Sequence, residues 1–132
     1  MSRKKSKYPT ELELEILKIL WDESPLTVRN VREAMAGAGR ALAHTSLITT
    51  LNVMYDKGFV RRSDSQQRGY EFAPRISRED VSQGMVGDLV QRVFDGSASA
   101  LMLSLLQHEE LDDDTHAALR QAIEHHRTGE RR

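Results

Sequence analysis

Small hydroxyl and amide side chains gather on one face of the segment from residue 42 to residue 57. At 100° of rotation per residue, one broad arc of such a helix holds Thr45, Ser46, Thr49, Asn52, Val53 and Asp56. Leu47, Leu51 and Met54 fall on the opposite side. Hydroxyl and amide groups can bond to base edges in a DNA major groove, where Asn can pair with adenine and methyl groups contact thymine. The segment therefore predicts a DNA-reading helix, with an ordinary solvated amphipathic helix as the alternative.

Basic side chains follow in a stretch where polar and apolar residues alternate. The alternation predicts two strands joined by a polar hairpin at 64–69, with Arg68 at its tip. An arginine at that place can contact a phosphate or enter the minor groove. Arg61 and Arg62 point to opposite faces of a regular strand, so at most one of them is expected to share that role. Solubilising charge on a strand edge is the alternative for all three arginines.

Three helices and the hairpin are expected to position these groups. Thr10-Glu11-Leu12-Glu13 fits a capping box for a first helix, which ends before Pro25. Thr27 is a suitable N-cap for a short second helix, and Gly58 stops the third. The strands expected after it are 59–63 and 70–73. Three short helices followed by a polar two-stranded hairpin form the layout of a winged helix-turn-helix.

The second half of the chain is predicted to be helical. Ser77 begins another capping box, Asp95-Gly96-Ser97 breaks that helix, and Asp112-Asp113-Asp114 place negative charge at the start of a last helix. The segment 100–106 between them is nearly all apolar, which leaves a large patch to be covered. The same region of a second chain would cover it, and the winged domain is the alternative. The side chains expected at the subunit contact are Val81, Met85, Leu89, Phe94, Leu101 and Leu105.

We therefore expect a mainly α fold with a small β-hairpin, made of a winged helix-turn-helix domain and a helical dimerisation domain. The expected divisions are a flexible basic leader at 1–8, the DNA-binding domain at 9–76, the dimerisation domain at 77–127 and a frayed tail at 128–132. Charge divides in a similar way, because residues 1–75 carry 13 Lys and Arg against 9 Asp and Glu, whereas residues 76–132 carry 6 against 11. The basic half is the one expected to touch a polyanion.

The composition disfavours several other classes of protein. The 132 residues contain no cysteine, which removes disulfides, zinc ribbons and thiolate sites. No apolar run approaches the roughly 18 residues that a membrane span needs, so a cytoplasmic protein without membrane insertion is expected. His125 and His126 do not fit a metal-binding H-E-x-x-H frame, and neither a glycine-rich phosphate loop nor a G-x-S-x-G elbow is present. We expect no enzyme activity, no metal and no cofactor.

A series of short motifs resembles, in order, the penicillinase repressor family. The motifs are Glu13-Leu14-Glu15-Ile16-Leu17-Lys18-Ile19-Leu20-Trp21, Pro25-Leu26-Thr27-Val28, His44-Thr45-Ser46-Leu47-Ile48-Thr49-Thr50-Leu51, Lys57-Gly58, Arg68-Gly69-Tyr70-Glu71-Phe72-Ala73-Pro74-Arg75-Ile76-Ser77 and Phe94-Asp95-Gly96-Ser97. The resemblance spans roughly residues 8–125. It implies a homodimer bound to an inverted repeat of double-stranded DNA in a promoter. In the β-lactam-responsive members, a membrane sensor-protease triggers cleavage in the dimerisation domain, so such a system is an implied partner.

The resemblance also transfers roles to single positions, with some departures. The positions that match the family's DNA-reading stretch and its wing arginine are Thr45, Ser46, Thr49 and Arg68. Val53 stands where many members have Arg, so a base or phosphate contact is missing there. The absence of cysteine rules out the thiolate copper sensing of the copper-responsive branch. The segment 103–106 aligns with the cleavage region but lacks the local residues of the best-known cleaved members.

Two functions from different classes follow. The first is a sequence-specific transcriptional repressor that acts as a homodimer on an inverted-repeat operator and is relieved by proteolysis in the dimerisation domain. The second is a protein–protein adaptor that uses the winged helix as a scaffold without specific DNA binding. Salt-dependent binding to DNA separates them, because only the repressor exchanges counterions for phosphate contacts.

Overall fold

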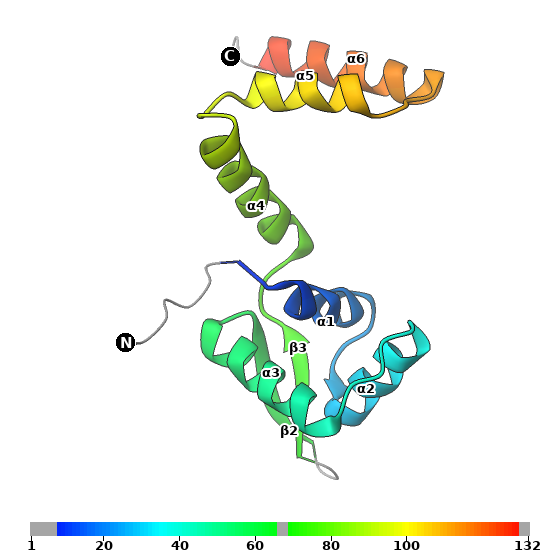
Figure 1. The fold of residues 1–132 in the computed structure, drawn as a ribbon, viewed down its shortest axis with the longest axis vertical. Coiled ribbons are helices and arrows are strands. Elements are labelled where there is room, and N and C mark those ends of the chain that lie inside the picture. The colour runs from blue at the N-terminus through cyan, green and yellow to red at the C-terminus, as the bar shows by residue number, and fades with distance from the viewer. Residues whose placement is uncertain (1–7, 66–68, 130–132) are drawn as a thin grey trace. The chain divides into compact units, whose positions relative to one another are not determined.

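The computed structural model describes residues 8–65 and 69–129. These residues form six helices and one three-stranded sheet (Figure 1). The element bounds are α1 Glu11–Asp22, β1 Leu26–Thr27, α2 Val28–Gly37, α3 His44–Lys57, β2 Val60–Ser65, β3 Gly69–Pro74, α4 Arg78–Val93, α5 Ala98–His108 and α6 Asp113–Gly129. The predicted mainly α fold with a small hairpin is thereby confirmed. The chain divides into two compact units between Gly87 and Asp88. The predicted functional boundary between 76 and 77 stays a prediction.

The N-terminal ends of α1 and α2 form as their sequences predict. The Thr10 hydroxyl accepts from the Glu13 N–H at 3.2 Å, and the Glu13 carboxylate accepts from the Thr10 N–H at 2.8 Å. This reciprocal capping box satisfies two backbone donors that a helix otherwise leaves unpaired. Thr27 caps α2 by accepting from the Asn30 N–H at 3.2 Å. The two caps mark where α1 and α2 begin.

The start of α3 differs from the prediction, whereas its end before Gly58 is as predicted. The helix begins at His44, two residues late, because Ala43 has extended backbone at φ −67° and ψ 147°. At the other end Gly58 adopts φ 85°, a left-handed conformation that favours glycine. The Phe59 N–H then donates to the Met54 carbonyl at 2.9 Å. Phe59 therefore completes the end of the helix, and the first strand of the hairpin starts one residue later than predicted.

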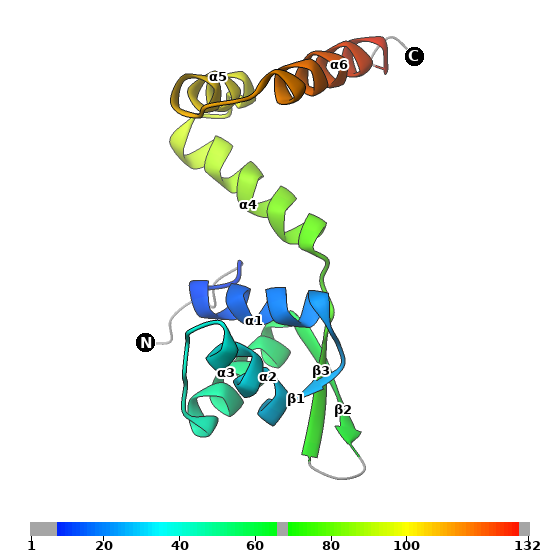
Figure 2. The ribbon, with the colours of Figure 1, turned by 90° about the vertical axis from the view of Figure 1, so that its right-hand side faces the viewer.

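The hairpin belongs to a sheet of three strands in the order β1-β3-β2. β2 and β3 pair antiparallel with Arg62 opposite Phe72, and β1 pairs antiparallel with β3 through Leu26 and Thr27. Figure 2 shows the strands beside the three helices of this unit. The sequence predicted only the two strands of the hairpin, so it missed β1. Two residues are too few to show the alternation that reveals a strand in a sequence.

The core of the first unit lies between its helices and its sheet. Its buried apolar side chains are Ile16, Leu17, Leu20, Val31, Met35, Leu47, Leu51, Met54, Phe59, Val60 and Phe72. Full burial of one such side chain contributes about 2 kcal/mol relative to exposure. Because α3 buries Leu47, Leu51 and Met54 completely, the opposite face of that helix must face outward.

The beginning of α4 is also part of the first unit. Ser77 caps α4 by accepting a backbone N–H three residues along at 2.9 Å. The indole N–H of Trp21 donates to the Ile76 carbonyl at 2.9 Å, and the Arg78 guanidinium lies 5.0 Å from the centre of the Trp21 ring. Val81 is only 5% exposed within the single chain. Val81, a predicted subunit contact, is therefore already buried within the single chain.

The breaks between α4, α5 and α6 follow the predicted signals. Asp95 and Gly96 take positive φ values of 50° and 86°, which end the path of α4. Ser97 caps α5, which is longer than the apolar run that predicted it. Asp112 caps α6 by accepting from the Thr115 N–H at 2.8 Å. Hydrogen bonds from Thr115, and to a smaller extent the charge of His116, lower the pKa of the Asp112 carboxyl. The last helix reaches Gly129, one residue past the predicted start of the tail at 128.

Candidate nucleic-acid interface

The outward face of α3 carries the predicted hydroxyl groups. Thr45, Ser46 and Thr49 are all exposed, so the structure brings these three positions together on one side of the helix. Asn52 lies on the same arc but is half-buried, and Val53 is 38% exposed. The predicted separation of a packing face from an outward face is thereby confirmed. The contacts of these side chains with DNA stay predictions.

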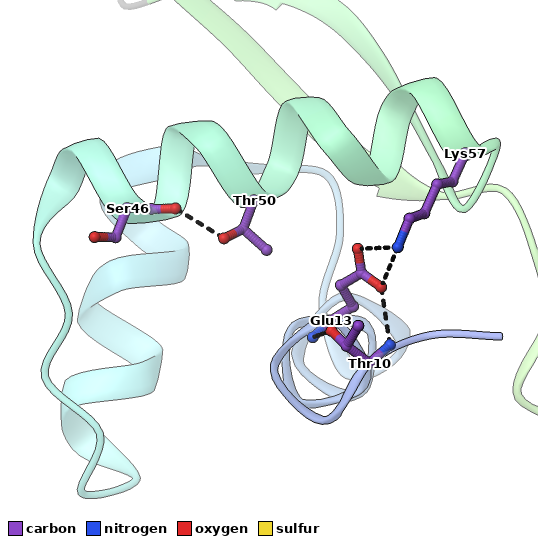
Figure 3. A network of polar contacts seen from close by, with 5 residues as sticks. All are labelled: Thr10, Glu13, Ser46, Thr50 and Lys57. Atoms are coloured by element: carbon purple, nitrogen blue, oxygen red, sulfur yellow. Dashed lines mark hydrogen bonds and ion pairs between the residues drawn. The ribbon is translucent and has the colours of Figure 1, made fainter. Parts of the chain in front are cut away.

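The hydroxyl of Thr50 is used within α3 and not on its outward face. Thr50 is half-buried, and its Oγ1 donates to the Ser46 carbonyl at 2.8 Å (Figure 3). The neighbouring Thr49 side chain is exposed instead. Two adjacent threonines of the same helix therefore have different surroundings, which makes them a matched pair for substitution.

A buried ion pair fixes the C-terminal end of α3 against the N-terminal end of α1 (Figure 3). The Lys57 ammonium lies 3.0 Å from each carboxylate oxygen of Glu13. The side chains of Lys57 and Glu13 are only 9% and 4% exposed. The same carboxylate accepts from the Thr10 N–H, so the capping box and the ion pair share one group. The ion pair therefore adds a polar contact between α1 and α3 to the apolar packing of the core.

Sequence reasoning did not find this ion pair, because its partners lie 44 residues apart. A signal was present in the first helix, where Glu13 shares the spacing of the buried Ile16, Leu17 and Leu20. A carboxylate on a buried helical face requires a cation or several donors. The spacing therefore indicates a buried partner without identifying it.

An arginine of the hairpin joins the sheet to α3. The Arg62 guanidinium lies 4.0 Å from the ring centre of Tyr55 and 4.5 Å from that of Tyr70. Its Nη1 donates to Asn52 Oδ1 at 3.0 Å. Arg61 is exposed on the other face of the strand, which confirms that the two arginines point in opposite directions. Helix α3 and the hairpin are thus joined by a cation between two aromatic rings.

The two tyrosines of this cluster were not predicted to take part in the site. Tyr70 and Arg62 both lie on the side of the hairpin that carries the buried Phe72 and Val60, a relation that strand alternation reveals. The position of Tyr55 depends on how α3 packs on the sheet, which the sequence does not give. Arg68 and the leader at 1–7 lie outside the described residues, and their roles stay predictions.

The helical region, made of α4, α5 and α6, exposes many of its large apolar side chains. No residue of α5 or α6 is buried. Among the predicted subunit contacts, Phe94 and Leu101 are half-buried, and Met85, Leu89 and Leu105 are 37%, 40% and 51% exposed. Other large apolar side chains exposed on these helices are Val86, Val93, Met102, Leu103, Leu106, Leu119 and Ile123. Apolar surface of this extent on a helical region is typical of an interface.

Two further features are absent from residues 8–65 and 69–129. In that part of the chain no helix is long and apolar enough to cross a membrane. Within the same ranges, His, Asp and Glu side chains form no group of three or more that could hold a metal ion.

Comparisons with known proteins bear on the whole of this arrangement. The family model described as "Penicillinase repressor" matches residues 9–125. The "Penicillinase repressor" of Bacillus licheniformis is 21% identical over 118 residues, which cover 89% of this chain and 91% of that protein. The "Methicillin resistance regulatory protein MecI" of Mammaliicoccus sciuri is 21% identical over 111 residues, covering 84% and 89%. Both relatives are named as regulators and not as enzymes. With most of its length matched in one family, the chain belongs to the penicillinase repressor family.

Proposed function

We propose that this protein is a transcriptional repressor that binds double-stranded operator DNA as a homodimer. The observation that carries the proposal is the outward face of α3, where Thr45, Ser46 and Thr49 are exposed and the opposite face is buried. Hydroxyl groups on an exposed helix suit the base edges and phosphates of a major groove. Membership of a family of repressors supports the same role.

The proposed homodimer forms through the helical region. Leu105 and Leu106 of α5 are about half exposed in the single chain, at 51% and 49%. A second copy would cover this surface and relate two copies of α3 by a two-fold axis. Two reading helices then meet half-sites of an inverted repeat, typically about 34 Å apart on one side of the duplex. The geometry of the operator follows from the symmetry of the protein.

The proposal also includes how repression is relieved. By the resemblance to β-lactam-responsive members, a membrane sensor-protease system would act on the dimerisation domain. The gene neighbourhood tests this part, and we expect a gene for a membrane sensor-protease beside this one. A neighbourhood without such a gene contradicts this mode of relief and leaves the DNA-binding proposal standing.

The proposal is tested by gel shifts on the DNA upstream of the protein's own gene. A repressor retards this duplex more strongly than a shuffled duplex of the same length and composition. The logarithm of its binding constant also falls linearly with the logarithm of the salt concentration. Equal retardation of the two duplexes, or none, contradicts the proposal and favours the adaptor.

Thr49→Ala is expected to weaken binding to the specific duplex by about 1 kcal/mol or more, the scale of one direct base contact. Binding to the shuffled duplex should barely change, since the substitution removes no charge. Thr50→Ala is the matched control, because the Thr50 hydroxyl bonds within the helix. Fluorescence anisotropy titrations measure both duplexes. Equal losses on specific and shuffled DNA would contradict a base contact by Thr49.

A further inference from the structure

Arg62 stands at the junction between the hairpin and the reading helix. Its guanidinium lies between the rings of Tyr55 and Tyr70, at 4.0 and 4.5 Å from their centres. Among the described residues no carboxylate forms an ion pair with it, so within these ranges its hydrogen-bond partner is the Asn52 amide at 3.0 Å. A half-buried arginine held in this way has a restricted position.

This contact determines which way the Asn52 amide points. An arginine side chain has donors and no acceptor, so the atom of Asn52 that faces it must be the carbonyl oxygen. The NH₂ group of Asn52 then points away from Arg62, and it donates to no other residue in the described part of the chain. Asn52 therefore presents two free donors on the arc that also carries Thr45 and Thr49.

We infer that Arg62 is a positioning residue that turns Asn52 into a hydrogen-bond donor for a base. The inference rests on the proposed DNA-binding function and deepens it. Pairing with adenine uses both ends of an Asn amide, the oxygen toward N6 and the NH₂ toward N7. Arg62 holds the oxygen toward itself through one of its two lone pairs, so the group that faces outward is the NH₂, which suits guanine because N7 and O6 are both acceptors. One base position of the operator is thus read as guanine over adenine.

Binding-site selection with the full chain on a library of randomised duplexes gives the probe. The selected duplex and its single-base-pair variants are then titrated with wild type, Arg62→Lys and Asn52→Asp. Arg62→Lys keeps the charge but loses the planar fork, so the Asn52 amide is free to turn. It should lose roughly tenfold in guanine-over-adenine preference at one position, the scale of a single base contact, and keep its preferences elsewhere.

Asn52→Asp separates positioning from direct contact. The carboxylate still accepts from Arg62 but removes both outward donors, so the same base position should lose its guanine preference and shift toward cytosine, whose N4 group donates. The double variant Arg62→Lys with Asn52→Asp should change the base preference at that position no more than Asn52→Asp alone, because both substitutions act through the side chain at position 52. Tyr55→Leu removes one of the two rings that hold Arg62, so it should also weaken the guanine preference at that position. This variant takes the place of Arg62→Lys in the test if Arg62→Lys does not fold.

Arg61→Lys is the matched control, because Arg61 is exposed on the same strand and faces the other way. Its base preferences should equal those of the wild type. The inference is overturned if Arg62→Lys and Tyr55→Leu keep the guanine preference, or lose preference equally at every position. A wild type that selects no sequence overturns the proposed function as well, whereas selection without an Arg62 effect overturns the inference alone.

Discussion

Leu105→Asp is expected to dissociate the homodimer and to weaken operator binding by two orders of magnitude or more. The Leu105 side chain is 51% exposed in the single chain and lies in the surface proposed to meet a second copy. A charge buried there without a partner costs several kcal/mol. Once the dimer is lost, each reading helix binds its half-site alone, and the effective concentration that linked the two contacts disappears. Sequence preference should survive, because α3 is unchanged.

Sedimentation velocity and operator titration measure the two effects on one sample. Gln107→Asp is the matched control, since it adds the same charge to the exposed opposite side of α5. A fragment of residues 1–87 should fold, stay monomeric and lose most of the operator affinity. It must extend to Gly87 because Val81 is buried in the first unit. If Leu105→Asp remains dimeric, or the fragment binds a full operator as tightly as the intact chain, the helical region does not form the dimer.

Lys57→Met is expected to lower the free energy of unfolding by about 3–5 kcal/mol, the usual cost of removing one partner from a buried ion pair. The Glu13 carboxylate would remain 4% exposed in its side chain with only a backbone donor from Thr10. Loss of the cation also releases the C-terminal end of α3 from α1. Urea unfolding followed by circular dichroism gives the free energy, and the midpoint should fall without a change in slope.

Two further variants show whether burial causes this loss. Arg29→Met removes a partner from the Arg29–Glu33 pair on α2, whose side chains are 63% and 61% exposed. An exposed pair contributes at most about 1 kcal/mol, so this variant should remain close to wild type. The double variant Glu13→Gln with Lys57→Met should recover part of the loss, because no buried charge is left. Equal losses for Lys57→Met and Arg29→Met would contradict the buried-pair account.

The sequence predicted those parts of the fold that depend on neighbouring residues. The Thr10 and Thr27 caps, the glycine at the end of α3 and the break at Asp95 all act within a few positions, so their signals are local. The outward face of α3 was also predictable, since rotation by 100° per residue is fixed by helix geometry. β1 was missed because its two residues form a strand only by pairing with β3.

The parts of the candidate site that escaped prediction depend on contacts between distant elements. Alternation placed Arg61 and Arg62 on opposite faces, but it did not show that Tyr55 and Asn52 of another element receive Arg62. The Glu13–Lys57 pair joins two helices across 44 residues in the same way. Single-sequence periodicity assigns a face to each side chain, whereas the partner on that face is set by tertiary packing.

The lack of any buried side chain in α5 and α6 has a consequence for the amount of protein present. If association supplies the free energy that holds these helices, their melting temperature follows mass action and rises with protein concentration. Each tenfold dilution removes about 1.4 kcal/mol from the assembled state at 25 °C. Below the dissociation constant, two thinly supported helices per chain become accessible to any protease in the cell. The number of copies that a cell maintains then determines how long each copy survives.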